Sequence, residues 1–157
     1  MSIIYLDTSA LLKLYIQEKR SEEVSALLDL ADGAGTSILT FTEMASAMAR
    51  AVQMKFISDS EAESTWRIFS HDWPGYTRLK IPAPLTERAA DMAWEFGLRG
   101  YDAMHLASAL TWQDALEVPV CLATFDQLLW GAGQKVGMDI WPENLEGGVP
   151  TRKIGKS

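Results

Sequence analysis

Short apolar runs alternate with longer amphipathic stretches along the whole of this chain. The short runs predict strands at residues 2–6, 36–39, 76–81, 120–123 and 138–141. In the stretches between them apolar residues recur at helical spacing, which predicts helices at residues 9–17, 21–32, 42–55, 58–73, 84–98, 102–112 and 125–135. Strands that alternate with helices favour an α/β fold, here a three-layer α/β/α sandwich around a mainly parallel sheet of about four to five strands.

Local signals set the predicted ends of several helices. Thr8 or Ser9 can cap the first helix. Gly33 and Gly35 are predicted to end the second helix, and Pro74 the fourth.

Tryptophans mark the faces that these helices should bury. Trp66, Trp73 and Trp94 lie in amphipathic stretches, so we expect them in the core. Trp112 and Trp130 fall near predicted helix ends, where partial exposure would let them pack against a partner or stack on a base.

Length and composition indicate one globular domain. The chain has 157 residues, 48% apolar and 22% charged, which is enough to bury a core of ordinary composition. No apolar run approaches the roughly 18 residues that span a bilayer. Asp7 and Lys13 interrupt the first apolar stretch, so a signal peptide is not expected. We therefore expect a cytoplasmic protein with a domain over residues 1–142 and a flexible, basic tail over residues 143–157.

The net charge of −7 limits the kind of partner that the whole surface can attract. A protein that coats nucleic acid would be basic, so broad electrostatic binding is disfavoured. A nuclease is not excluded, because divalent ions would neutralise a cluster of carboxylates locally.

Four acidic residues recur where an apolar run gives way to a helical stretch: Asp7, Glu43, Asp102 and Asp126. In a parallel sheet such boundaries meet at one edge, where ligands bind. Each acid alone could be an ordinary helix cap. Together they would repel one another without a cation. Carboxylate oxygens suit Mg²⁺ or Mn²⁺, so the pattern predicts a metal site able to activate water against a phosphodiester.

Other chemistries find less support in the sequence. The phosphate-binding motif G-x-x-x-x-G-K-[ST] is absent. A zinc site would need more ligands than His71, His105 and a single cysteine provide; His105 is predicted to pack or to support the site, and Cys121 to be a buried, inert thiol. Two alternatives stay open. One is an aspartyl phosphatase or phosphotransferase with Asp7 as nucleophile, although Ser9 replaces its second aspartate. The other is a catalytically silent binding module.

Four segments in register resemble PIN-domain ribonucleases of the VapC type, the toxins of toxin–antitoxin pairs. They are LDTSALLKLY, TEMASA, LRGYDAMHLASAL and LATFDQLL, and the resemblance covers residues 2–142. It implies a Mg²⁺- or Mn²⁺-dependent endoribonuclease whose acidic quartet is Asp7, Glu43, Asp102 and Asp126. It further implies supporting roles for Thr8 or Ser9 and for Thr124.

The resemblance also implies partners. It predicts a homodimer that is inhibited by a cognate antitoxin, with DNA contacted only through that antitoxin. Lys13, Arg50 and Arg99 are the basic residues nearest the quartet in the sequence, and we predict that Lys13 or Arg99 contacts the RNA backbone. The sequence leaves open which RNA is cut.

Overall fold

The computed structural model describes residues 2–145, which form one five-stranded sheet in the order β3-β2-β1-β4-β5. The strands are β1 (Ile3–Leu6), β2 (Gly33–Ser37), β3 (Thr77–Leu79), β4 (Val120–Ala123) and β5 (Asp139–Trp141). Every neighbouring pair is parallel, which confirms the predicted fold class.

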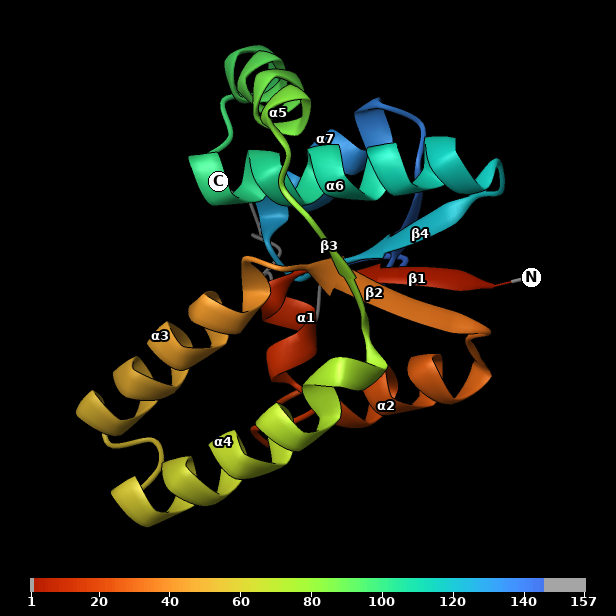
Figure 1. Ribbon diagram of the computed structural model, residues 1–157. Helices are drawn as coiled ribbons and strands as arrows, with labels where there is room; N and C mark the ends of the chain where they lie inside the picture. Colours follow the sequence, from red (N-terminus) through yellow and green to blue (C-terminus); the bar gives the residue numbers. More distant parts are fainter. Residues whose placement is uncertain (1, 146–157) are drawn as a thin grey trace, which may run out of the picture.

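Helices cover both faces of this sheet (Figure 1). They are α1 (Thr8–Leu12), α2 (Ser21–Leu30), α3 (Thr40–Gln53), α4 (Asp59–Asp72), a 3-10 turn η1 (Trp73–Gly75), α5 (Ala83–Phe96), α6 (Gly100–Leu116) and α7 (Gln127–Lys135). The first four helices lie against one face and the last three against the other. These are the three layers that the sequence predicts.

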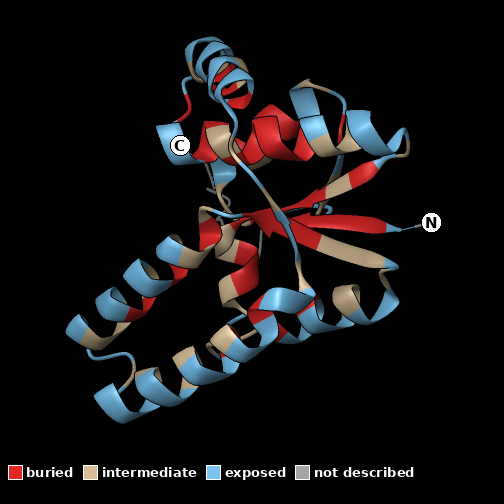
Figure 2. Ribbon diagram, viewed as in Figure 1, coloured by how far each residue is buried: buried red, intermediate tan, exposed pale blue. Residues whose placement is uncertain are grey.

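Strand β1 shows why the central strands are apolar throughout. Ile3 and Tyr5 belong to the core under α5, α6 and α7, whereas Ile4 and Leu6 belong to the core under the other helices. Successive side chains of a strand point to opposite faces, so a strand covered on both sides buries all of them. In Figure 2 β1 is accordingly buried along most of its length.

Strand β2 begins earlier than predicted, because glycine has a packing role there. Gly33 and Gly35 lie inside the strand instead of ending the preceding helix. A β-carbon on Gly35 would lie 2.7 Å from the Trp112 ring and 3.0 Å from the carbonyl oxygen of Thr77. The missing side chain therefore lets α6 approach the sheet closely.

Some other predicted boundaries and environments were also wrong. The first helix ends at Leu12 and gives way to turns, and α6 extends to Leu116. Trp66 and Trp73 pack with Phe69 in the core as predicted, but Trp94 on α5 is 89% exposed. Helical spacing alone did not reveal that this side of α5 is left uncovered by the rest of residues 2–145.

Among residues 2–145 no helix is long and apolar enough to cross a membrane. The predicted tail lies almost wholly outside the described residues, and Leu145 at their end is buried.

Candidate active site

A cavity of about 500 Å³ lies where the carboxyl ends of β1 and β2 meet the amino ends of α1, α3 and α6. All four acids of the predicted quartet line it. Its lining is Asp7, Thr8, Ser9, Leu12, Leu39, Thr42, Glu43, Ser46, Ala47, Arg50, Arg99, Tyr101, Asp102, His105 and Asp126. A larger cavity of about 920 Å³ adjoins it between α3 and α4, but none of the four acids lines that one.

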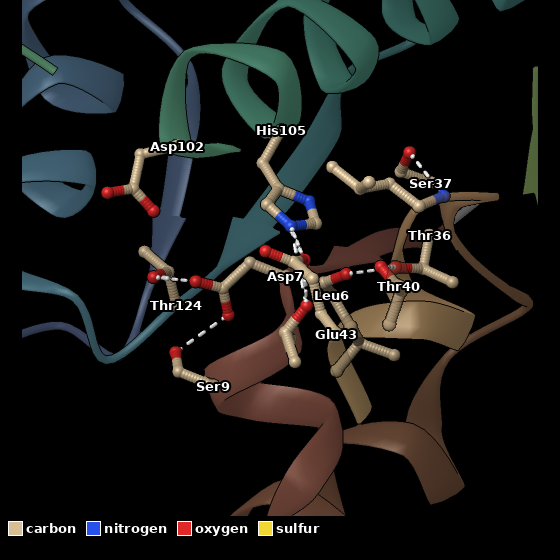
Figure 3. Close-up of polar contacts among 12 residues, drawn as sticks. Leu6, Asp7, Ser9, Thr36, Ser37, Thr40, Glu43, Asp102, His105 and Thr124 are labelled. Carbon is tan, nitrogen blue, oxygen red and sulfur yellow. Dashed lines mark hydrogen bonds and ion pairs between the residues drawn. The ribbon is translucent and has the colours of Figure 1, made fainter. Parts of the chain in front are cut away.

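Asp7 accepts hydrogen bonds on both of its carboxylate oxygens, two of them drawn in Figure 3. It caps α1, and its Oδ1 accepts hydrogen bonds from the Ala10 amide at 2.9 Å and from Ser9 Oγ at 2.7 Å. Its Oδ2 accepts one from Thr124 Oγ1 at 2.5 Å, and its own amide donates to the Ala123 carbonyl at 3.2 Å. Burial raises the pKa of Asp7 despite these bonds, so its ionised form is held at an energetic cost.

Glu43 stands in the first turn of α3, where two side chains hold one of its oxygens. Thr8 Oγ1 donates to Oε1, and His105 Nε2 lies 2.8 Å from the same oxygen. The other ring nitrogen of His105 lies 2.7 Å from the hydroxyl of Tyr5, which is fully buried. In Figure 3 His105 points from α6 toward Glu43.

The pKa shifts of this pair agree on an ion pair. Burial favours neutral His105, but the hydrogen bond to Glu43 and the charges of Asp7 and Glu43 outweigh it and raise the pKa of His105. Burial likewise favours neutral Glu43, but the hydrogen bond and charge of His105 lower its pKa overall. Both shifts favour a protonated histidine beside a carboxylate.

Asp102 reaches the site by a route different from the predicted one. It does not follow a strand: α5 ends at Phe96 and is capped by Gly97, whose φ of 67° is the left-handed conformation that glycine tolerates, and Asp102 lies in the first turn of α6. Asp126 follows β4 and caps α7 by accepting a hydrogen bond from the Leu129 amide at 2.9 Å.

Arg99 connects these two carboxylates. Its Nε lies 3.2 Å from Oδ2 of Asp102, and its Nη2 lies 3.0 Å from Oδ2 of Asp126. Burial and the charge of Asp126 raise the pKa of Asp102, while Arg99 opposes the rise. The two acids are therefore close enough to repel one another.

The structure separates the two predicted RNA-binding residues. Arg99 lines the cavity, but Lys13 does not: its Nζ donates to the carbonyl of Lys19 at 2.9 Å and lies 4.7 Å from the centre of the Phe125 ring.

Other residues of the cavity carried a weaker signal in the sequence. Arg50 lies one helical turn from Ser46 on α3, and its Nη1 donates to Ser46 Oγ at 2.8 Å. Tyr101 lines the rim of the cavity and is 61% exposed. In the sequence, only its position next to Asp102 could have indicated that it belongs to the site.

The donor set suits a hard divalent cation in kind and number, since four carboxylates line one cavity and two of them raise the pKa of a third. Within residues 2–145, however, no three acidic, histidine or cysteine side chains are grouped closely enough to hold a metal ion as they stand. The carboxylates instead contact Thr124, His105 and Arg99. The residues fit Mg²⁺ or Mn²⁺ chemically, and holding an ion would require some of these contacts to change.

Comparison with known proteins places the chain in a family. The family model of the PIN domain matches residues 4–129. The chain therefore belongs to the PIN-domain family. Ribonuclease VapC45 and Ribonuclease VapC49, both from Mycobacterium tuberculosis, are each 32% identical to it over 146 residues, which covers 93% of this chain and 99% of theirs. Within the PIN-domain family, the chain is thus a relative of the VapC ribonucleases over nearly its whole length.

Solved structures agree on the fold at lower identity. PAE2754 from Pyrobaculum aerophilum is 18% identical with a TM-score of 0.62, covering 93% of this chain and 85% of that one. FitAcB from Neisseria gonorrhoeae is 17% identical with a TM-score of 0.60, covering 87% of this chain and 95% of that one.

Proposed function

We propose that this protein is a Mg²⁺- or Mn²⁺-dependent endoribonuclease and the toxin of a toxin–antitoxin pair. The observation that carries the proposal is that four carboxylates from α3, α6 and the ends of β1 and β4 line one cavity. Relatives named as VapC ribonucleases, matched over almost their full length, support RNA as the substrate. Asp7, Glu43, Asp102 and Asp126 would hold the metal.

A divalent ion bound there would polarise the phosphodiester and lower the pKa of an attacking water molecule. The neighbouring side chains would hold the carboxylates in place for that chemistry. Ser9 and Thr124 fix both oxygens of Asp7, so this carboxylate needs little reorganisation during the reaction. Thr8 and His105 both contact Oε1 of Glu43, and neither contacts Oε2. That oxygen stays available to a metal ion, and the lowered pKa of Glu43 keeps its carboxylate ionised.

Arg99 and Arg50 are the arginines in the lining of the cavity, and we propose that they contact RNA phosphates. The overall charge of −7 makes such local cations necessary for a nucleic-acid substrate. Arg99 is the better candidate, because its side chain is 74% exposed beside two of the acids. Lys13 remains a weaker candidate, since its ammonium group is engaged away from the cavity.

The partners follow from the same proposal. A cognate antitoxin would inhibit the enzyme, and the solved toxin–antitoxin complex from Klebsiella pneumoniae has a fold that this chain shares, with a TM-score of 0.54. We further propose a homodimer, DNA contact only through the antitoxin, and a cytoplasmic site of action, where RNA targets are found.

The decisive experiment is cleavage of a pool of transfer, ribosomal and messenger RNA by the purified, partner-free protein. The reactions contain Mg²⁺, Mn²⁺ or EDTA. The test variant is Asp102→Asn, and the matched control is Asp114→Asn, which changes an exposed aspartate on the same helix. We expect metal-dependent cleavage that Asp102→Asn loses by at least about 100-fold and Asp114→Asn retains.

Other results would favour other functions. The wild type and Asp102→Asn could both be folded and fail to cut RNA. If Asp102→Asn still arrests cell growth in that case, the silent binding module is the better description. A phosphoryl group trapped on Asp7 would point to the aspartyl phosphatase, although both Asp7 oxygens already accept hydrogen bonds.

A further inference from the structure

The guanidinium of Arg99 joins two acids that the proposed reaction requires for metal binding. It donates through two different nitrogens to Asp102 and to Asp126. These acids come from different elements, α6 and the loop before α7, so the arginine also links the two. A lysine would have to contact both carboxylates through one nitrogen, without the planar fork of a guanidinium.

The two oxygens of Asp126 have separate partners. Oδ1 accepts from the Leu129 amide and so caps α7, while Oδ2 accepts from Arg99. Asp126 can therefore give Oδ2 to another cation and still cap its helix, provided that Arg99 withdraws. Asp102 likewise uses Oδ2 for Arg99.

We propose that Arg99 is an internal counter-ion that competes with the divalent metal for Asp102 and Asp126, so that metal binding releases its guanidinium toward the substrate. This inference rests on the proposed metal-dependent nuclease function. It gives Arg99 a second role besides RNA contact: in the metal-free protein, Arg99 partly neutralises Asp102 and Asp126.

Electrostatics favours both halves of this exchange. Without a cation Asp102 is repelled by Asp126 and by Asp7, and Arg99 reduces that repulsion. A divalent ion carries twice the charge in a smaller volume and so displaces a single guanidinium. The Arg99 side chain is 74% exposed, and an ion pair of that kind is weak enough to break.

The released guanidinium would stay beside the reaction site. Arg99 is the residue immediately before the first turn of α6, outside the helix, so its side chain can rotate without disturbing the helical hydrogen bonds. A freed arginine at this rim is a forked donor suited to a phosphate group.

Calorimetric titration with Mn²⁺ alone tests the exchange on the full chain. Arg99→Gln removes the competing charge, and Arg99→Lys keeps the charge without the forked contact. Arg88→Gln is the matched control, because Arg88 forms a single exposed ion pair with Asp114 away from the cavity. We expect Arg99→Gln to bind Mn²⁺ about three to ten times more tightly than the wild type, Arg99→Lys to fall between them, and Arg88→Gln to match the wild type.

A second measurement separates this role from simple RNA contact. Without metal, Arg99→Gln should melt at a lower temperature than the wild type, and Mn²⁺ should raise its melting temperature by more. Unchanged or weaker Mn²⁺ affinity in Arg99→Gln, while the wild type binds Mn²⁺ and cuts RNA, would overturn the counter-ion role alone. Cleavage in EDTA with no Mn²⁺ binding in any variant would overturn the metal-dependent function as well.

Discussion

At the scale of single residues, burial and charge act in opposite directions on His105. Its side chain is 2% exposed, yet it faces Glu43 directly and lies close to Asp7 and Asp102. A buried neutral histidine would leave Glu43 without the ion pair that its Oε1 now makes. The contact with Glu43 therefore favours the protonated ring, and this contact orients one acid of the site.

Replacement of His105 by glutamine tests this ion pair. The pKa of His105 is raised, so its contribution to stability is complete below its unfolded pKa of about 6.5 and is lost as the pH rises through the folded value. We expect His105→Gln to lower the free energy of unfolding by about 2–3 kcal/mol at pH 6 and by less at pH 9. Chemical denaturation of both proteins at the two pH values measures the difference. A loss that grows with pH would contradict a protonated histidine.

The amide variant of Asp102 tests the repulsion between the acids. Burial and Asp126 raise the pKa of Asp102, so the ionised form destabilises the metal-free fold above that raised pKa, and the effect disappears when the pH falls below about 4. Asp102→Asn should therefore melt about 1–3 °C higher than the wild type at pH 7 in EDTA, and no higher at pH 3.5. Thermal melts of Asp114→Asn provide the control. An equal or lower melting temperature at pH 7 would indicate that lost contact with Arg99 outweighs the relieved repulsion.

At the scale of elements, the predicted bounds were most accurate where a sequence signal had only one structural interpretation. The apolar runs 2–6 and 120–123 became β1 and β4 within one residue, because a strand buried on both faces has no polar position. Gly35 misled the prediction because a glycine can end a helix or admit a neighbouring ring, and only the position of Trp112 decides which. Asp102 lies, as predicted, near the carboxyl ends of the strands, although the element before it is a helix.

The close approach at Gly35 gives a prediction with a matched control. Gly35→Ala would place its β-carbon against the Trp112 ring and the Thr77 carbonyl, so we expect a loss of about 1–3 kcal/mol in the free energy of unfolding. Gly131→Ala in α7 meets no atom within 4 Å and should leave stability unchanged or raise it by up to about 1 kcal/mol. Urea denaturation compares the two. Equal effects would show that α6 can move away from the sheet at little cost.

At the scale of the whole molecule, the sequence predicted which acids would meet but not how they are held. Parallel strands bring Asp7 and Asp126 to one edge by topology alone. The hydrogen bond of Glu43 to Thr8 depends on how α1 and α3 pack together, and its contact with His105 depends on how α3 and α6 pack on opposite faces of the sheet. Such contacts join residues that are far apart in the chain, so no local sequence pattern predicts them.

Divalent metal should stabilise the whole fold by mass action. A site that binds only the folded chain adds about 2.7 kcal/mol at a hundred times its dissociation constant, or about 5–10 °C in melting temperature for a domain of this size. We expect Mn²⁺ to produce such a shift in the wild type and in Asp114→Asn, and a smaller one in Asp102→Asn. Differential scanning fluorimetry at several Mn²⁺ concentrations tests this. The same shift in all three proteins would place the ion elsewhere.

The wide spacing of the acids along the chain, from Asp7 to Asp126, bears on how a cell could make such an enzyme. A nascent chain that has not yet delivered Asp126 lacks one wall of the cavity, and β4 must be inserted beside β1 before the acids can meet. A chain synthesised from the amino end therefore cannot assemble the four acids until β4 and Asp126 have left the ribosome. Until that point the messenger RNA being translated is not exposed to the assembled site.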